Sequence, residues 1–254
     1  MINKLDKLFL DKTSMKLMTH VVAGYPDMET TELMVLLMEE SGVDMVEIQI
    51  PFSDPIADGV TIAGANQMAL ENGATPAGCL KLIEKLASKV KIPLLVMTYG
   101  NILYHWGVEE FIKKSVGCGV SGLIVPDLPF DWDQGYYEIA EKYSCDAIRV
   151  VSPGISSNRL DSLLKEARGF VYTTLRVGVT GARSGVDERG LKFLGMLKER
   201  TELPIAAGFG ISSREMLDGL RGLADMGVIG SHILDIFNQE GLPGVGFFIR
   251  ECKM

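Results

Sequence analysis

Short apolar runs alternate along this chain with longer segments whose apolar positions recur at helical spacing. The longer segments predict helices because residues three or four apart share one helix face. The apolar runs are continuous, which is typical of strands buried on both faces. They predict strands over residues 17–24, 44–50, 92–101, 121–129, 147–154, 169–175, 203–212 and 227–233. Helices are expected over residues 29–41, 63–71, 77–88, 108–116, 133–143, 159–167, 190–200 and 213–223.

Eight strands, each followed by a helix, favour one architecture over its main competitor. An open doubly wound sheet also alternates strands with helices. Eight near-even units within a chain of 254 residues favour instead a closed parallel (β/α)8 barrel, the TIM barrel, with extra short helices. No linker or low-complexity tract separates a second unit, so we expect a single TIM-barrel domain over residues 1–254.

Composition narrows the classes of partner and of cofactor. The formal net charge of −8 argues against nucleic-acid binding. No segment approaches the roughly 20 apolar residues that cross a bilayer, and we expect a cytoplasmic protein with no membrane partner. The four cysteines form no metal-ligand spacing and are expected to be reduced thiols. His20, His105 and His232 are far apart, so no metal site is expected, and His20 and His232 are interpreted as packing or capping residues.

Candidate chemistry starts in the run MVEIQIPFSDPIADG, at the end of the second predicted strand. Glu47 interrupts an apolar strand, and burial of a carboxylate raises its pKa unless it is paired. It would then be able to give and take a proton, whereas Asp58, in the more exposed loop, would stay ionised. Two plainer interpretations stay open. Glu47 could form an internal salt bridge with Lys16 or Arg149, and Asp58-Gly59 could be a simple turn.

Glycine-rich turns follow the last three predicted strands. They contain Gly178 and Gly181, then Gly208 and Gly210, then Gly230 and Ser231. Backbone N–H groups at such turns, next to helix N-termini, bind anions, and the loops after strands seven and eight are the usual phosphate site of these barrels. The alternative is that these glycines only end strands and cap helices. Three such turns in succession favour a phosphate site.

The motifs themselves resemble a known family. The strings EIQIPFSDPIADG, ANQMAL, GLIVPDLP, GVTGAR, AAGFGIS and GVIGS follow one another over nearly the whole chain. In this order they resemble the tryptophan synthase alpha subunit family. The resemblance implies a barrel lyase that cleaves indole-3-glycerol phosphate by a retro-aldol reaction, releasing indole and glyceraldehyde 3-phosphate.

The resemblance also implies roles for individual residues. Glu47 would be the acid–base group and Asp58 would engage the indole nitrogen. Tyr172 and Tyr99 would contact the substrate, and Thr180 would contact the aspartate from a mobile lid. The phosphate would be held by Gly181, Gly210, Gly230 and Ser231.

The family works with a beta subunit in an alpha2-beta2 complex, and this partner is implied here. Pyridoxal phosphate is expected only in the beta subunit, so no cofactor is expected in this chain. Three positions depart from the family pattern: His20, Tyr25 and Gln49. Gln49 shares a strand side with Glu47, and we expect it to narrow the barrel interior or to hydrogen-bond the glutamate.

Two other functions compete with this interpretation. Another phosphate-binding barrel, such as a Schiff-base aldolase, would need a lysine inside the barrel, and the predicted strands have none in their interior. The second alternative is a catalytically reduced barrel that mainly binds and activates a beta partner. The presence of Glu47, Asp58 and Tyr172 argues against it.

Overall fold

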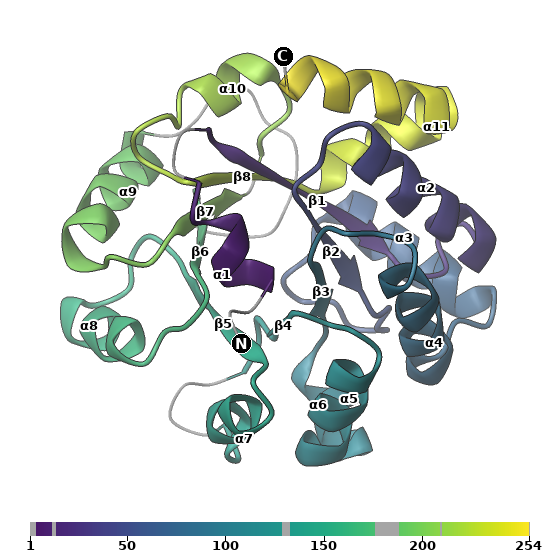
Figure 1. Ribbon diagram of the computed structural model, residues 1–254, viewed down its shortest axis with the longest axis horizontal. Helices are drawn as coiled ribbons and strands as arrows, with labels where there is room; N and C mark the ends of the chain where they lie inside the picture. The colour runs from purple at the N-terminus through teal and green to yellow at the C-terminus, as the bar shows by residue number, and fades with distance from the viewer. Residues whose placement is uncertain (1–3, 12–13, 129–132, 176–187, 209, 254) are drawn as a thin grey trace.

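Eight parallel strands close into a barrel in the computed structural model, in the order of the sequence (Figure 1). The structure describes residues 4–11, 14–128, 133–175, 188–208 and 210–253. The TIM barrel predicted from the sequence is therefore confirmed. The strands are β1 (Lys16–Val22), β2 (Met45–Gln49), β3 (Leu94–Met97), β4 (Gly122–Ile124), β5 (Asp146–Val151), β6 (Val171–Thr174), β7 (Ile205–Gly208) and β8 (Met226–Ile229).

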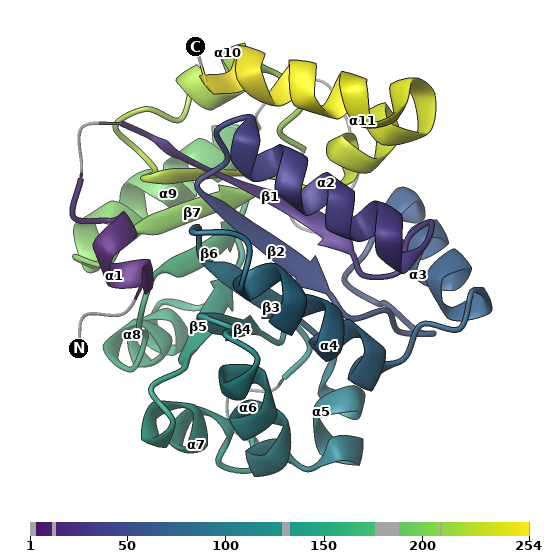
Figure 2. The same cartoon turned by 45° about the vertical axis from the view of Figure 1, so that its right-hand side comes forward.

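Helices surround the barrel on its outer side, as Figures 1 and 2 show. Thr75 accepts a hydrogen bond from the Gly78 N–H and caps the helix whose first turn contains Pro76. The helices among the described residues are α1 (Lys4–Leu8), α2 (Met28–Glu40), α3 (Val60–Glu71), α4 (Pro76–Ala87), α5 (Gly100–Trp106), α6 (Val108–Gly117), α7 (Tyr136–Lys142), α8 (Ser157–Lys165), α9 (Glu188–Arg200), α10 (Arg214–Asp218) and α11 (Ser231–Lys253), the last with non-helical backbone at Gly241.

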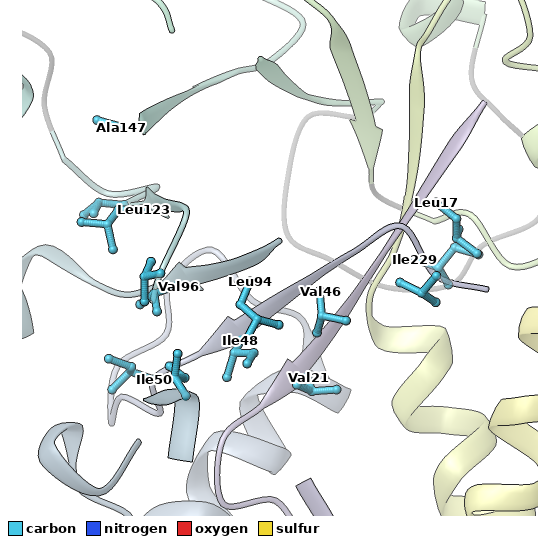
Figure 3. Close-up of a cluster of buried hydrophobic side chains, with 14 of the residues drawn as sticks. Leu17, Val21, Val46, Ile48, Ile50, Leu94, Val96, Leu123, Ala147 and Ile229 are labelled. Atoms are coloured by element: carbon cyan, nitrogen blue, oxygen red, sulfur yellow. The ribbon is translucent and has the colours of Figure 1, made fainter. Parts of the chain in front are cut away.

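The strands separate two apolar cores because successive side chains point to opposite faces. The outer core fills the space between barrel and helices, and Figure 3 shows part of it, including Val46 and Ile48 of β2. The inner core fills the barrel itself and includes Met18 and Met45. Leu5 of α1 is fully buried in this inner core, so α1 packs against the barrel interior.

Several predicted elements were wrong in extent, among them the eighth strand, which ends at Ile229 rather than at residue 233 because α11 begins at Ser231. The third strand does not reach residue 101, because α5 begins at Gly100. The helix predicted from residue 133 begins only at Tyr136, since Gln134 and Gly135 have positive φ angles that a right-handed helix excludes. The helix expected to reach residue 223 ends at Asp218, and Gly219 follows as its cap.

Two predictions from composition are tested by the described residues. All four cysteines are free and buried, as expected for reduced thiols. Within the described ranges, no helix combines the length and apolar character needed to cross a membrane.

The two glycines of α9 provide a matched test of the packing of this helix. A Cβ on Gly190 would lie 2.3 Å from the Leu175 carbonyl oxygen, whereas a Cβ on Gly195 would meet nothing within 4 Å. We expect Gly190→Ala to lower the free energy of unfolding by about 1–3 kcal/mol. Gly195→Ala should raise it by about 0.5–1 kcal/mol, because alanine favours the helix. Urea denaturation measures both, and equal stabilities of the two variants would contradict this packing.

Candidate active site

Glu47 lies on the inner side of β2 and is only 4% exposed. Its neighbour in the β1–β2 register is His20, and His20 Nδ1 lies 3.0 Å from Glu47 Oε2. The partners expected from the sequence, Lys16 and Arg149, are wrong. Lys16 Nζ, at the opposite end of β1, donates to Asp11, and Arg149 Nη2 donates to Glu166. Glu47 is therefore paired with an imidazole that lines the same pocket.

His20 is more than the packing or capping residue predicted from the sequence. It is 5% exposed and lines the pocket together with Glu47. Burial lowers the pKa of an imidazole, but the negative charge of Glu47 and the hydrogen bond to it outweigh burial, and the pKa of His20 is raised above 6.5. The sequence places His20 on a strand, but only the β1–β2 register reveals its partner.

Asp58 is held by two donors at one carboxylate oxygen. Gln49 Nε2 donates to Asp58 Oδ2 at 2.7 Å, and the Tyr99 hydroxyl donates to the same oxygen at 2.9 Å. The aspartate is half-buried rather than exposed as the sequence suggested, and burial raises the pKa of its carboxyl above 3.8. The hydrogen bonds from Gln49 and Tyr99 and the nearby charge of His20 oppose this rise. The pKa of Asp58 is thus raised, and the expected ionised state of this aspartate at neutral pH stays a prediction.

One of the two expectations for Gln49 was a hydrogen bond to Glu47, and this expectation was wrong. Its amide nitrogen donates to Asp58 and, at 3.2 Å, to Asn66 Oδ1. Asn66 also accepts from the Phe52 N–H and donates to the Ile62 carbonyl oxygen. Gln49 therefore ties the loop that carries Asp58 to α3.

Tyr99 supports the same loop from the turn between β3 and α5. Its side chain is fully buried and stacks on Phe52 with ring centroids 5.2 Å apart. Besides donating to Asp58, its hydroxyl accepts a hydrogen bond from the Ala57 N–H at 3.2 Å. Tyr99 is not among the residues that line the pocket. Its described contacts hold Asp58 rather than form a pocket wall.

One pocket at the C-terminal ends of the strands brings the carboxylates and the glycine turns together. Glu47 and Asp58 line it from β2 and the following loop, and Tyr172 lines it from β6. A Cβ on Gly208 would lie 2.7 Å from the Tyr172 hydroxyl oxygen, so glycine leaves the space that this ring occupies. Burial raises the pKa of Tyr172 well above 10, and the phenol stays neutral.

Glycine turns form another part of the pocket lining. Gly210 has a φ of 89°, a backbone conformation that favours glycine. Gly230 and Ser231 line the same pocket, and Ser231 begins α11, whose N-terminus adds partial positive charge. Thr180 and Gly181, and the lid expected around them, lie outside the described residues.

Apolar side chains complete the lining of the pocket. They suit a flat apolar ring next to the two carboxylates. Several of these residues lie in the strands predicted from the sequence, but they were not predicted to line a pocket. Side chains alternate between the two faces of a strand, so counting every second residue from an inward-facing position such as Glu47 would identify the other inward-facing positions of its strand. The apolar lining residues are Ala57, Ile62, Met97, Ile124, Pro126, Val150, Ile211 and Val228. Within the described part of the chain, no cluster of three histidine, cysteine or acidic side chains suits a metal ion.

Comparison with known proteins identifies relatives that have a similar sequence and share this architecture. The family model for the tryptophan synthase alpha chain matches residues 8–242. The tryptophan synthase alpha chain of Desulforapulum autotrophicum is 43% identical over 234 residues, covering 92% of each chain. A tryptophan synthase structure from Mycobacterium tuberculosis superposes with a TM-score of 0.90 at 31% identity, covering 98% of this chain and 95% of that one.

A more distant structure gives the same result. A chain of the tryptophan synthase complex from Pyrococcus furiosus has a TM-score of 0.85 at 28% identity, covering 94% of this chain and 97% of that one. The family model and the curated relative each cover most of the sequence. The chain belongs to the tryptophan synthase alpha chain family.

Proposed function

We propose that Glu47 and Asp58 carry the retro-aldol cleavage of indole-3-glycerol phosphate in this chain. Membership of the family makes the protein a lyase of tryptophan biosynthesis that releases indole and glyceraldehyde 3-phosphate. The observation that supports these roles is that both carboxylates line one pocket with the glycine turns at Gly210 and Gly230. One substrate that carries an indole at one end and a phosphate at the other matches this arrangement.

The reaction needs one proton to move from a hydroxyl to a ring carbon. Glu47 delivers a proton to indole C3, and the ring becomes a cation that Asp58 stabilises at the nitrogen. The bond between C3 and the side-chain carbon then breaks, and its electrons restore the aromatic ring. The hydroxyl on that side-chain carbon loses its proton to Glu47 and becomes the aldehyde. The acid form of Glu47 is thereby regenerated.

The remaining predicted residues bind and orient the substrate. The backbone at Gly210, Gly230 and Ser231 would hold the phosphate, with the N-terminus of α11 favouring the negative charge. Tyr172 would line the indole, and Tyr99 would act through the Asp58 carboxylate that it holds. Gly181 and Thr180 keep the phosphate-binding and lid roles that the resemblance implies.

The partner of this chain would be a tryptophan synthase beta chain. The Pyrococcus furiosus structure is described as a tryptophan synthase complex, and this chain covers 97% of the matched chain. We propose the same alpha2-beta2 heterotetramer here, with pyridoxal phosphate held by the beta chain and no resident cofactor in this one. The chain would act as a single cytoplasmic domain.

Indole release in the absence and presence of a beta chain tests this proposal. We expect slow release of indole by the alpha chain alone and a rate that rises to a plateau as beta chain is added. The alternative, a barrel that mainly activates its partner, predicts that indole-3-glycerol phosphate binds and that beta-chain activity rises without indole release. That result would overturn the catalytic proposal and retain the partner.

A further inference from the structure

Two buried polar atoms beside the carboxylates have no hydrogen-bond partner among the described residues. They are Nε2 of His20 and Oε1 of Gln49. The other polar atom of each side chain is occupied, since His20 Nδ1 contacts Glu47 and Gln49 Nε2 donates to Asp58 and Asn66. An unsatisfied buried polar atom destabilises the folded state. The two side chains that hold the carboxylates thus each keep one unused atom.

The contacts that are made assign donor and acceptor atoms in both side chains. When Glu47 is ionised its Oε2 is an acceptor, and His20 Nδ1 carries the hydrogen between them. Gln49 donates with its nitrogen to two acceptor oxygens, so its remaining atom is the acceptor Oε1. A neutral His20 would have only a lone pair on Nε2. An imidazolium has a second N–H and can donate to an acceptor on that side as well.

We propose that His20 is a positioning residue for the cleavage reaction, which as an imidazolium pairs with Glu47 and holds that carboxylate in the pocket. This inference rests on the proposed function, because it gives His20 its role through Glu47. Each carboxylate is then held by a residue of a barrel strand, Glu47 by His20 and Asp58 by Gln49. The His20–Glu47 pair also retains one proton at neutral pH.

The retained proton is the one that the reaction needs. A lone glutamic acid with a pKa of about 4.3 is ionised at neutral pH and has no proton to deliver. The pair keeps its proton until the imidazolium titrates, and the pKa of His20 is raised by Glu47, Asp58 and the Gln49 side chain despite the opposing effect of burial. Proton transfer to indole C3 removes this proton from the pair, and the substrate hydroxyl returns it. Such coupled groups titrate as a unit.

The groups that face His20 from the neighbouring elements support this charge state. Glu47 on β2 and Asp58 on the following loop both favour the cation. Tyr172 on β6 and Tyr99 in the turn after β3 stay neutral, because burial raises the pKa of each phenol. No cation takes part in the described contacts of the His20 side chain. The imidazolium is therefore the positive charge that balances the carboxylates.

Nitrogen NMR on the full chain tests the charge state without any substrate. The chain has three histidines, and His20→Asn assigns the His20 signals by their loss. We expect both His20 nitrogens to be protonated at pH 6.5 and the imidazole to titrate above that value. His232, whose pKa burial lowers, is an internal reference. Gln49→Ala should lower the His20 pKa, and Glu47→Gln should lower it further.

Kinetics of two substitutions at position 20 test the effect on the reaction. Asparagine keeps a hydrogen-bond donor near the position of Nδ1 but loses the positive charge. Phenylalanine keeps the shape of a ring but loses both the donor and the charge. We expect kcat to fall roughly 10-fold in His20→Asn and roughly 100-fold in His20→Phe, with KM changed less than about threefold. The alkaline limb of the pH–rate profile should move at least about one unit to lower pH in His20→Asn. His105→Asn, at an exposed position on α5, is the control and should behave as the native chain.

The outcomes separate this inference from the proposed function. A neutral His20 at pH 6.5, a His20 pKa unaffected by Glu47→Gln, or an unchanged alkaline limb in His20→Asn would overturn this role of His20. Absence of indole release from the native chain would overturn the proposed function. The NMR titration would still decide whether the imidazolium is present.

Discussion

Glu47→Gln should lower the rate of indole release by about 100- to 10,000-fold, the range associated with loss of a general acid–base group. Glutamine keeps the shape of the side chain and can still accept a hydrogen bond from His20, so the pocket geometry is preserved. It cannot deliver or take up a proton. KM should change little, because no expected contact to the substrate phosphate is removed. The measurement is kcat and KM for indole release in the presence of saturating beta chain.

A second buried glutamate provides the control for this variant. Glu32 is 8% exposed and pairs with Lys85 of α4 and with Lys89 just beyond that helix, away from the pocket. Glu32→Gln also removes one buried carboxylate, and we expect it to leave kcat within about twofold of the native value. Equal rates for the native chain and Glu47→Gln would refute the role of Glu47.

Asp58→Asn should lower kcat by about 100- to 1,000-fold, the range seen when one preorganised group that stabilises a transition-state charge is removed. The remaining oxygen of asparagine can still accept the hydrogen bonds from Gln49 and Tyr99. The native chain needs the ionised aspartate, so its activity falls as the pH drops through the Asp58 pKa. Burial raises that pKa, so the loss begins at a higher pH than for an exposed aspartate. In Asp58→Asn the acid limb of the pH–rate profile should move to lower pH.

The control for Asp58→Asn lies at the opposite end of the barrel. Asp225 precedes β8 and accepts a hydrogen bond from the Ile205 N–H at 2.8 Å. Asp225→Asn should keep kcat and the acid limb of the native chain, whatever its effect on stability. If Asp58→Asn kept the acid limb of the native pH–rate profile, a group other than Asp58 would control activity at low pH.

The strand order was predictable because each strand of this barrel lies in a mainly apolar run. Lys16 shows the limit of predicting strand ends from apolar runs. It begins β1 although the apolar run starts at Leu17, because backbone pairing with β8 extends one residue beyond the apolar pattern. Helix α5 was missed because its seven residues directly follow the β3 turn and extend the same apolar sequence. Short elements carry too few periods for the pattern to separate helix from strand.

The site was predictable in its residue types and less so in its contacts. Glu47, Asp58 and Tyr172 meet in one pocket with the glycine turns, as the positions at the strand ends suggested. The sequence could not identify His20 as the partner of Glu47, because that contact depends on the register between two strands 27 residues apart. The direction of the Gln49 amide depends similarly on Asn66, which reaches it from α3.

The pocket draws its two sides from opposite halves of the chain. Glu47 and His20 come from the first two strands, whereas Gly210, Gly230 and Ser231 follow the last two, which close the ring by pairing β8 with β1. A nascent chain that lacks its final two strands already contains the acidic half but lacks Gly210, Gly230 and Ser231, most of the proposed phosphate site. Substrate affinity is therefore acquired only when synthesis and ring closure are complete. Bound substrate would in turn protect both ends of the polypeptide against unfolding.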